Sequence, residues 1–218
     1  INIGKFGEIL KLIKSKKCNK VIFAGNIIKP KLSKLKLDIR GLFYIPRIVK
    51  ASKLGDAAIL KVLIKILSEN NIKVIKLNTF NPELTLKKGV YTKIKPNLLE
   101  KEEIEKGIRT LKKINSYNHT QAVIIRDNKV ISRETRKGTK EMIKSVSKSK
   151  IKKGILIKLP KVKQDLRVDL PTIGIDTFKD CNKVGIKGIV VKSNQNIILN
   201  KEVCIKYANE NKLFLIAI

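Results

Sequence analysis

Amphipathic helices alternate with short apolar strands along this chain, and that alternation restricts the possible folds more than any other feature. Residues 4–16 and 56–71 place apolar side chains three and four positions apart, which predicts two helices. Apolar runs follow them at 20–24 and 72–77 and predict strands. We place the amino-terminal cap of the second helix at Asp56. Alternating helices and strands with short connections favour a layered α/β sheet.

The alternation stops in a polar connection at 78–96 and then resumes, so we place a domain boundary in it. The predicted architecture is two small α/β domains, 1–78 and 79–218. The second domain should contain helices at 98–114, 138–149, 177–183 and 200–211, a hairpin of strands 122–126 and 130–135 turning through Asp127-Asn128-Lys129, and strands at 154–159, 188–192 and 213–218.

The chain is strongly basic, with 49 Lys and Arg against 18 Asp and Glu and a net charge of +31. Such a charge makes nucleic acid the first partner to consider. However, only seven of these cations are Arg, and the lysines are evenly spread among abundant Ile and Asn. This composition is typical of an A/T-rich genome, and no helix-turn-helix, zinc finger or aromatic RNA-stacking motif is visible. Nucleic-acid binding is therefore the least favoured of the alternatives.

Several other classes of protein are disfavoured by what the sequence lacks. Cys18, Cys181 and Cys204 are far apart and His119 is the single histidine, so no zinc site is indicated and His119 is interpreted as a loop residue. No apolar run approaches the ~18 residues of a membrane span. No glycine-rich nucleotide-binding loop of a common type is present. The chain begins at Ile1 without a signal peptide, which indicates an internal piece of a longer, unsecreted protein.

One polar segment, residues 158–177, interrupts this pattern between two apolar strands. It reads KLPKVKQDLRVDLPTIGIDT and holds two of the scarce carboxylates, Asp165 and Asp169, on either side of Arg167. One interpretation is a surface loop with solvated ion pairs. The other is a phosphate-handling site, in which Arg167 and the lysines bind phosphate oxygens while the aspartates hold a divalent cation or orient water.

The centre of this segment, QDLRVDLPTIG at 164–174, closely resembles the signature of the UDP-2,3-diacylglucosamine pyrophosphatases of lipid A biosynthesis, the LpxI-type family. The resemblance covers nearly the whole chain in the same order. Its other segments are FAGNIIKP at 23–30, LDIRG at 37–41, LGDAAILKVLIKIL at 54–67, QAVIIRDNKVISRE at 121–134 followed by Gly138-Thr139, and GILIKLPK at 154–161.

The resemblance implies two α/β domains with the substrate cleft between them, in an enzyme of a Gram-negative bacterium. The reaction it implies is hydrolysis of the diphosphate of UDP-2,3-diacylglucosamine to UMP and 2,3-diacylglucosamine 1-phosphate, with Mg²⁺. It also implies a cytoplasmic protein that is peripheral at the anionic inner face of the inner membrane, and we expect that it can form a homodimer.

The same resemblance suggests roles for individual residues. Asp165 and Asp169 are the predicted catalytic residues, and together with Glu134 they are the predicted Mg²⁺ ligands. The residues predicted to bind the substrate are Gln164, Arg167, Lys158, Thr172, Arg40, Gln121 and Thr139.

Three departures from the family pattern leave alternatives open. The glycine-rich first strand and turn of the family are missing, so we expect an incomplete amino terminus. Lys140 stands where the family usually has Asp, next to Glu141, and Thr120 stands where it usually has Gly. The main alternative is therefore a non-catalytic relative that still binds a nucleotide-sugar lipid, and a basic nucleic-acid-binding protein comes after it.

Overall fold

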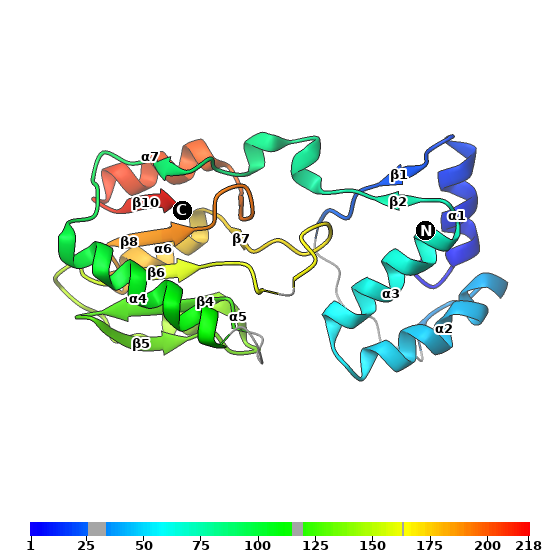
Figure 1. Cartoon of the computed structure of the whole chain (residues 1–218), viewed down its shortest axis with the longest axis horizontal. Coiled ribbons are helices and arrows are strands. Elements are labelled where there is room, and N and C mark those ends of the chain that lie inside the picture. The colour runs from blue at the N-terminus through cyan, green and yellow to red at the C-terminus, as the bar shows by residue number, and fades with distance from the viewer. Residues whose placement is uncertain (26–33, 115–119, 163) are drawn as a thin grey trace. The chain divides into compact units, whose positions relative to one another are not determined.

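The computed structural model describes residues 1–25, 34–114, 120–162 and 164–218. The expectation for His119, and part of the segment at 23–30, lie outside these residues. By its internal contacts the chain divides into two units (Figure 1). The first unit comprises Ile1–Phe80 and Asp165–Asp169, and the second comprises Asn81–Gln164 and Leu170–Ile218. The QDLRVDLPTIG segment thus contributes residues to both units.

The first unit contains three helices and a pair of short parallel strands. Its elements are α1 (Phe6–Ser15), β1 (Lys20–Val21), α2 (Ile39–Ser52), α3 (Asp56–Glu69) and β2 (Lys73–Val74). Strands β1 and β2 pair with Val21 opposite Val74. The core is formed by Phe6, Leu10, Tyr44, Ile64, Ile66, Leu67, Ile72 and Val74. The predicted helices and strands are therefore present, but both strands are shorter than the apolar runs that predicted them.

One local expectation in the first unit is wrong, and one helix of this unit was not predicted. The cap of α3 is Gly55, whose φ of 106° lies in the left-handed region, and Asp56 is the first helical residue. Helix α2 was not predicted, because it contains Pro46 in its interior and several of its apolar side chains are exposed. Its amino terminus is capped by Asp38, whose carboxylate accepts a hydrogen bond from Gly41 N at 2.7 Å. The same carboxylate also accepts from Glu8 N in the first turn of α1 at 3.0 Å.

The second unit is built on a mixed six-stranded sheet, so the predicted α/β class is confirmed. The strand order is β3-β10-β8-β6-β4-β5, and β6, β8 and β10 are parallel to one another. The strands are β3 (Gly89–Val90), β4 (Ala122–Arg126), β5 (Lys129–Arg133), β6 (Ile155–Lys158), β8 (Gly188–Val191) and β10 (Phe214–Ala217). A separate parallel pair joins β7 (Thr172–Ile173) to β9 (Ile197–Ile198). Two short 3₁₀ helices, η2 (Leu77–Thr79) and η3 (Pro82–Leu84), lie in the connection from β2 to β3.

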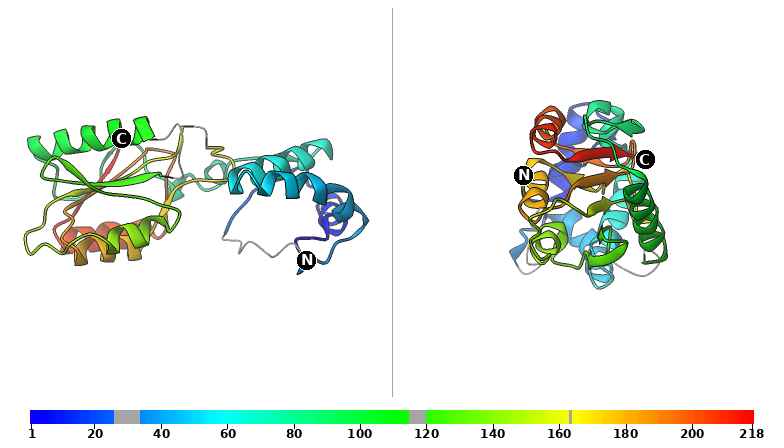
Figure 2. Two further views of the ribbon diagram at one scale, coloured as in Figure 1. Left: turned by 90° about the horizontal axis from the view of Figure 1, so that it is seen from below. Right: turned by 90° about the vertical axis from the view of Figure 1, so that its left-hand side faces the viewer.

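Helices cover both faces of the sheet (Figure 2). Helix α4 (Leu98–Ile114) covers one face, and α5 (Gly138–Lys144), α6 (Ile175–Lys183) and α7 (Lys201–Glu210) cover the other. Side chains alternate between the faces along β4, with Val123 toward α4 and Ile124 toward α5–α7. Because both faces are buried there, β4, β6, β8 and β10 are apolar at nearly every position, whereas the edge strand β5 is half exposed. Within the described parts of the chain, no helix combines the length and apolar character of a membrane-crossing segment.

The hairpin of β4 and β5 is confirmed in place, with a turn one residue shorter than predicted. Asp127 and Asn128 form the turn with φ values of 51° and 53°, and Lys129 already belongs to β5. Two consecutive left-handed residues are typical of a type I′ turn, whose twist matches the flanking strands. The predicted bounds of α4 are also confirmed, whereas α5 ends at Lys144, before the predicted end.

Candidate functional site

Strand direction decides where the polar residues of the second unit meet. Strands β6, β8 and β10 run parallel, so their carboxyl ends share one edge of the sheet, the usual location of ligand sites in α/β folds. Strand β6 ends there at Lys158. The antiparallel β4 begins there, since Ala122 pairs with Lys158, and β5 ends there at Arg133 opposite Val123.

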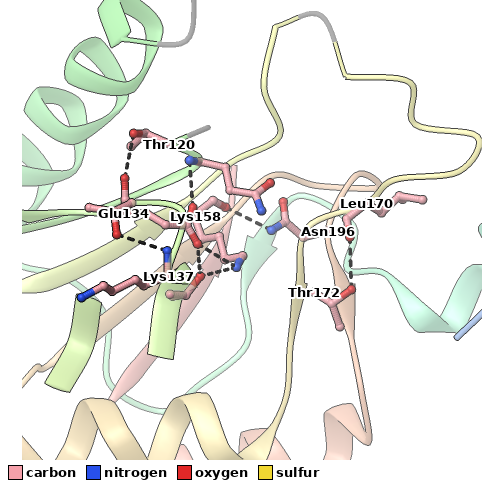
Figure 3. A network of polar contacts seen from close by, with 10 residues as sticks. Thr120, Glu134, Lys137, Lys158, Leu170, Thr172 and Asn196 are labelled. Atoms are coloured by element: carbon pink, nitrogen blue, oxygen red, sulfur yellow. Dashed lines mark hydrogen bonds and ion pairs between the residues drawn. The ribbon is translucent and has the colours of Figure 1, made fainter. Parts of the chain in front are cut away.

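An acid–lysine cluster of Glu134, Thr139 and Lys158 occupies this edge (Figure 3). The Thr139 hydroxyl donates to Glu134 Oε1 and accepts a hydrogen bond from Lys158 Nζ. The Lys158 Nζ lies 3.8 Å from Glu134 Oε1, and Glu134 Oε2 accepts from Gln121 N at 2.9 Å. The side chains of Lys158 and Glu134 are only 7% and 4% exposed. Four of the predicted site residues are thus brought together in one unit.

The burial of this cluster has an energetic consequence. Removing two opposite charges from water costs several kcal/mol per ion, which their attraction offsets only when the remaining polar atoms are well paired. Here the carboxylate of Glu134 has two donors, a backbone N–H and a hydroxyl, besides the nearby ammonium. The arrangement keeps a cation in a defined position at the end of a strand, which suits it to bind an anionic oxygen.

Two residues that support this edge were not predicted as part of the site. Asn196 is 1% exposed, donates from Nδ2 to Lys158 O at 3.1 Å and accepts at Oδ1 from Lys192 N at 2.9 Å. It therefore links the loop after β8 to the end of β6. Thr120 donates from its hydroxyl to Glu134 O at 2.8 Å, so this departure from the family pattern has a structural role. The only signal for Asn196 was a polar run, SNQN, directly after a buried strand.

Two glutamines of the second unit each carry a buried atom without a hydrogen-bond partner among the described residues. These atoms are Gln121 Oε1 and Gln164 Nε2. The Gln164 amide is oriented by its other atom, because Oε1 accepts from Lys161 N at 2.8 Å. An unsatisfied buried polar atom costs about 1–3 kcal/mol, so each is a group that a bound ligand would relieve. Both residues had been predicted to bind the substrate.

Asp165 and Arg167 bind each other within the first unit. Arg167 Nη2 donates to Asp165 Oδ2 at 2.7 Å, and both Nε and the backbone N donate to Oδ1 at 3.0 Å. The guanidinium holds the pKa of the Asp165 carboxyl below its ordinary value, and the carboxylate raises the pKa of Arg167. Nearby, Val168 packs against the core of the first unit. A phosphate group or a metal ion would therefore compete with an existing two-pronged ion pair.

Asp169 lies one turn beyond Asp165, and its backbone N donates to Asp165 O at 3.0 Å. Among the residues that the structure describes, no donor or cation pairs with its carboxylate. Hard oxygen ligands of this kind suit Mg²⁺. The third predicted ligand, Glu134, belongs to the second unit, so neither unit by itself contains all three carboxylates. No cluster of three or more potential metal ligands occurs in the described parts of the chain.

The remaining predicted residues are exposed. Thr172 donates from its hydroxyl to Leu170 O at 3.1 Å, and Arg40 Nη1 in the first unit donates to Asn70 Oδ1 at 3.1 Å. Lys140, the departure from the family's Asp, is exposed on α5. Its neighbour Glu141 pairs with Lys144 at 2.9 Å rather than with the acid–lysine cluster.

Comparisons with known proteins assign both parts of the chain. Residues 1–84 match the model of the LpxI N-terminal domain, and residues 87–216 match that of the LpxI C-terminal domain. A protein of Caulobacter vibrioides named UDP-2,3-diacylglucosamine pyrophosphatase LpxI is 29% identical over 226 residues, which cover 100% of this chain and 81% of that protein. The chain therefore belongs to the LpxI family.

Proposed function

We propose that this protein hydrolyses the diphosphate of UDP-2,3-diacylglucosamine and releases UMP and 2,3-diacylglucosamine 1-phosphate. The family and the name of the Caulobacter vibrioides relative support this reaction. The observation that carries the proposal is the acid–lysine cluster at the carboxyl edge of the sheet. Cleavage of a diphosphate depends mainly on groups that are already in place to stabilise negative charge, and this cluster is such a group.

In this proposal Lys158 binds a phosphate oxygen, and Glu134 and Thr139 are positioning residues. The carboxylate of Glu134 lies 3.8 Å from the Lys158 ammonium, and the Thr139 hydroxyl restricts where Nζ lies. A cation fixed in this way needs little reorganisation when the negative charge of the transition state develops. The unpaired atoms Gln121 Oε1 and Gln164 Nε2 would gain partners from the polar groups of the bound substrate.

We assign the leading catalytic role to Asp169 and a supporting role to Asp165. Asp165 is already paired with Arg167, whereas the Asp169 carboxylate has no partner in the described parts of the chain. When Mg²⁺ is bound, it supplies a Lewis acid for the diphosphate oxygens. Asp169 would hold the ion or orient the attacking water, and Asp165 would keep the Arg167 fork directed at a phosphate group. We assign Glu134 to the acid–lysine cluster and not to Mg²⁺, because both of its oxygens already accept hydrogen bonds, from the Thr139 hydroxyl and from Gln121 N.

The test is UMP release from UDP-2,3-diacylglucosamine by the parent protein, Asp169→Asn and a control, Asp176→Asn. Asp176 is an exposed aspartate in the first turn of α6 and has no assigned role. Asp169→Asn should lower turnover by about 100-fold, the scale of one lost electrostatic group, while the control keeps parental turnover. Substrate binding, measured separately, should persist in both variants.

Three results would change the proposal. Full turnover by Asp169→Asn would exclude its catalytic role. Undiminished turnover after chelation of divalent metal would remove Mg²⁺ from the mechanism. Binding of the lipid nucleotide with no turnover by the parent protein would favour the non-catalytic relative instead.

The lipid nature of the substrate is also the reason to place the protein at the cytoplasmic face of the inner membrane.

A further inference from the structure

The outward face of α2 carries three large apolar side chains that the fold leaves uncovered. Ile39, Leu42 and Phe43 are 86%, 59% and 72% exposed. They are spaced at i, i+3 and i+4, so they form one stripe on the helix. The opposite face packs into the first unit, where Tyr44 and Ala51 are buried. The stripe is therefore not a disordered end but part of a helix that is anchored on its other side.

The charges around this stripe are positive. Helix α2 contains no acidic residue, and Lys50 and Lys53 are exposed at its carboxyl end. Two acids that contact or precede α2, Glu69 and Asp38, already have partners. Glu69 is held by Arg47 at 2.7 and 2.8 Å, and Asp38 accepts hydrogen bonds from two backbone N–H groups. The surface thus combines apolar side chains with cations whose charge is not neutralised by a neighbouring carboxylate.

A second exposed apolar pair shows why the charge matters. Leu98 and Leu99 at the start of α4 are 76% and 72% exposed, as much as the α2 residues. However, the first half of that helix contains four glutamates. Glu102 and Glu105 are exposed, whereas Glu100 pairs with Lys187 and Glu103 is buried. A negatively charged surface would attract α2 and repel this end of α4. Exposure is similar at the two places, but the exposed charges beside them are of opposite sign.

We propose that α2 is the surface by which the protein docks on an anionic lipid bilayer. An amphipathic helix with aromatic and aliphatic residues on one side and cations beside them binds in the plane of the interface. Ile39, Leu42 and Phe43 enter the boundary between headgroups and acyl chains, and Lys50 and Lys53 contact lipid phosphates. This inference rests on the proposed function, because a substrate with two acyl chains lies in such a bilayer.

The test is sedimentation of the protein with vesicles of phosphatidylcholine and with vesicles that also contain phosphatidylglycerol. The test variant is Leu42→Ser with Phe43→Ser, and the matched control is Leu98→Ser with Leu99→Ser. All four side chains are exposed, so neither variant should lose its fold, which circular dichroism checks. The parent and the control should bind the anionic vesicles alike, and the α2 variant should bind at least about tenfold more weakly. Binding by the parent should fall when phosphatidylglycerol is omitted or salt is raised.

Equal binding by the α2 variant and the parent would overturn the inference. Sedimentation velocity without vesicles gives a second outcome that would overturn it. If the α2 variant sediments as a smaller species than the parent, the stripe joins two copies of the chain and does not dock on lipid. Turnover of detergent-dispersed substrate separates this inference from the proposed function. The α2 variant should keep parental turnover there. Vesicle binding without any turnover by the parent would refute the proposed reaction and leave the docking surface standing.

Discussion

Replacing Lys158 with Met should destabilise the second unit by about 3–5 kcal/mol, the usual cost of leaving one member of a buried ion pair without its partner. The structure supports a value of this size. At the observed 3.8 Å between Nζ and Glu134 Oε1, and with an effective dielectric constant of about 20, the Coulomb energy is about 4 kcal/mol. Met preserves most of the volume of the lysine stem, so the effect reports the lost charge rather than a cavity.

A double-mutant cycle isolates the pair. Glu134→Gln alone should also destabilise, since its new NH₂ group must face either the Gln121 N–H or the side of the cluster occupied by the Lys158 ammonium. In Lys158→Met with Glu134→Gln the ammonium is gone, and the amide can donate to the Thr139 hydroxyl instead. The double variant should therefore be more stable than the sum of the single effects predicts, by up to about 3 kcal/mol.

The measurement is urea unfolding followed by far-ultraviolet circular dichroism, because the chain has no Trp. The matched control is Lys153→Met. Lys153 pairs with Asp127 at 2.7 Å, but these side chains are 45% and 63% exposed, so its loss should cost less than about 1 kcal/mol. If Lys158→Met costs no more than Lys153→Met, the acid–lysine cluster does not behave as a buried ion pair and its proposed role in holding a cation fails.

Two further predictions concern the interior. Gly107→Ala should lower the melting temperature and reduce the free energy of unfolding by about 1–3 kcal/mol, because a Cβ there would lie 2.4 Å from Ile157 Cδ1 on β6. An unchanged melting temperature would mean that α4 can move off the sheet. In a thiol titration of the native protein near neutral pH one thiol should react, and all three after unfolding, since burial raises the pKa of two thiols and keeps them from ionising. The reactive thiol is Cys18. The protected thiols are Cys181, whose pKa is raised by its burial, and Cys204, whose pKa is raised to about 11. Rapid labelling of more than one native thiol would contradict the structure.

Features that depend on neighbours in the sequence could be predicted from the sequence alone. The bounds of α4 follow from its apolar spacing, and the β4–β5 hairpin follows from Asp127 and Asn128, which tolerate left-handed backbone. Helix α2 could not be predicted in the same way. Its period is obscured because part of its apolar surface faces outward, and whether a side chain is buried depends on the packing of α1 and α3.

The same distinction between local and long-range features applies to the candidate site. The resemblance to the family pointed to Lys158, Glu134, Thr139 and Gln121. These residues are 5 to 37 positions apart in the chain, and they share one edge only because β4 and β6 are antiparallel in a particular register. Asn196 supports the end of β6 only because β8 lies parallel beside it, and the sequence gives almost no signal for this contact. Amino-acid types determine which charges the chain carries. Long-range strand pairing decided which of those charges are buried together, because register is set by the packing of the whole sheet.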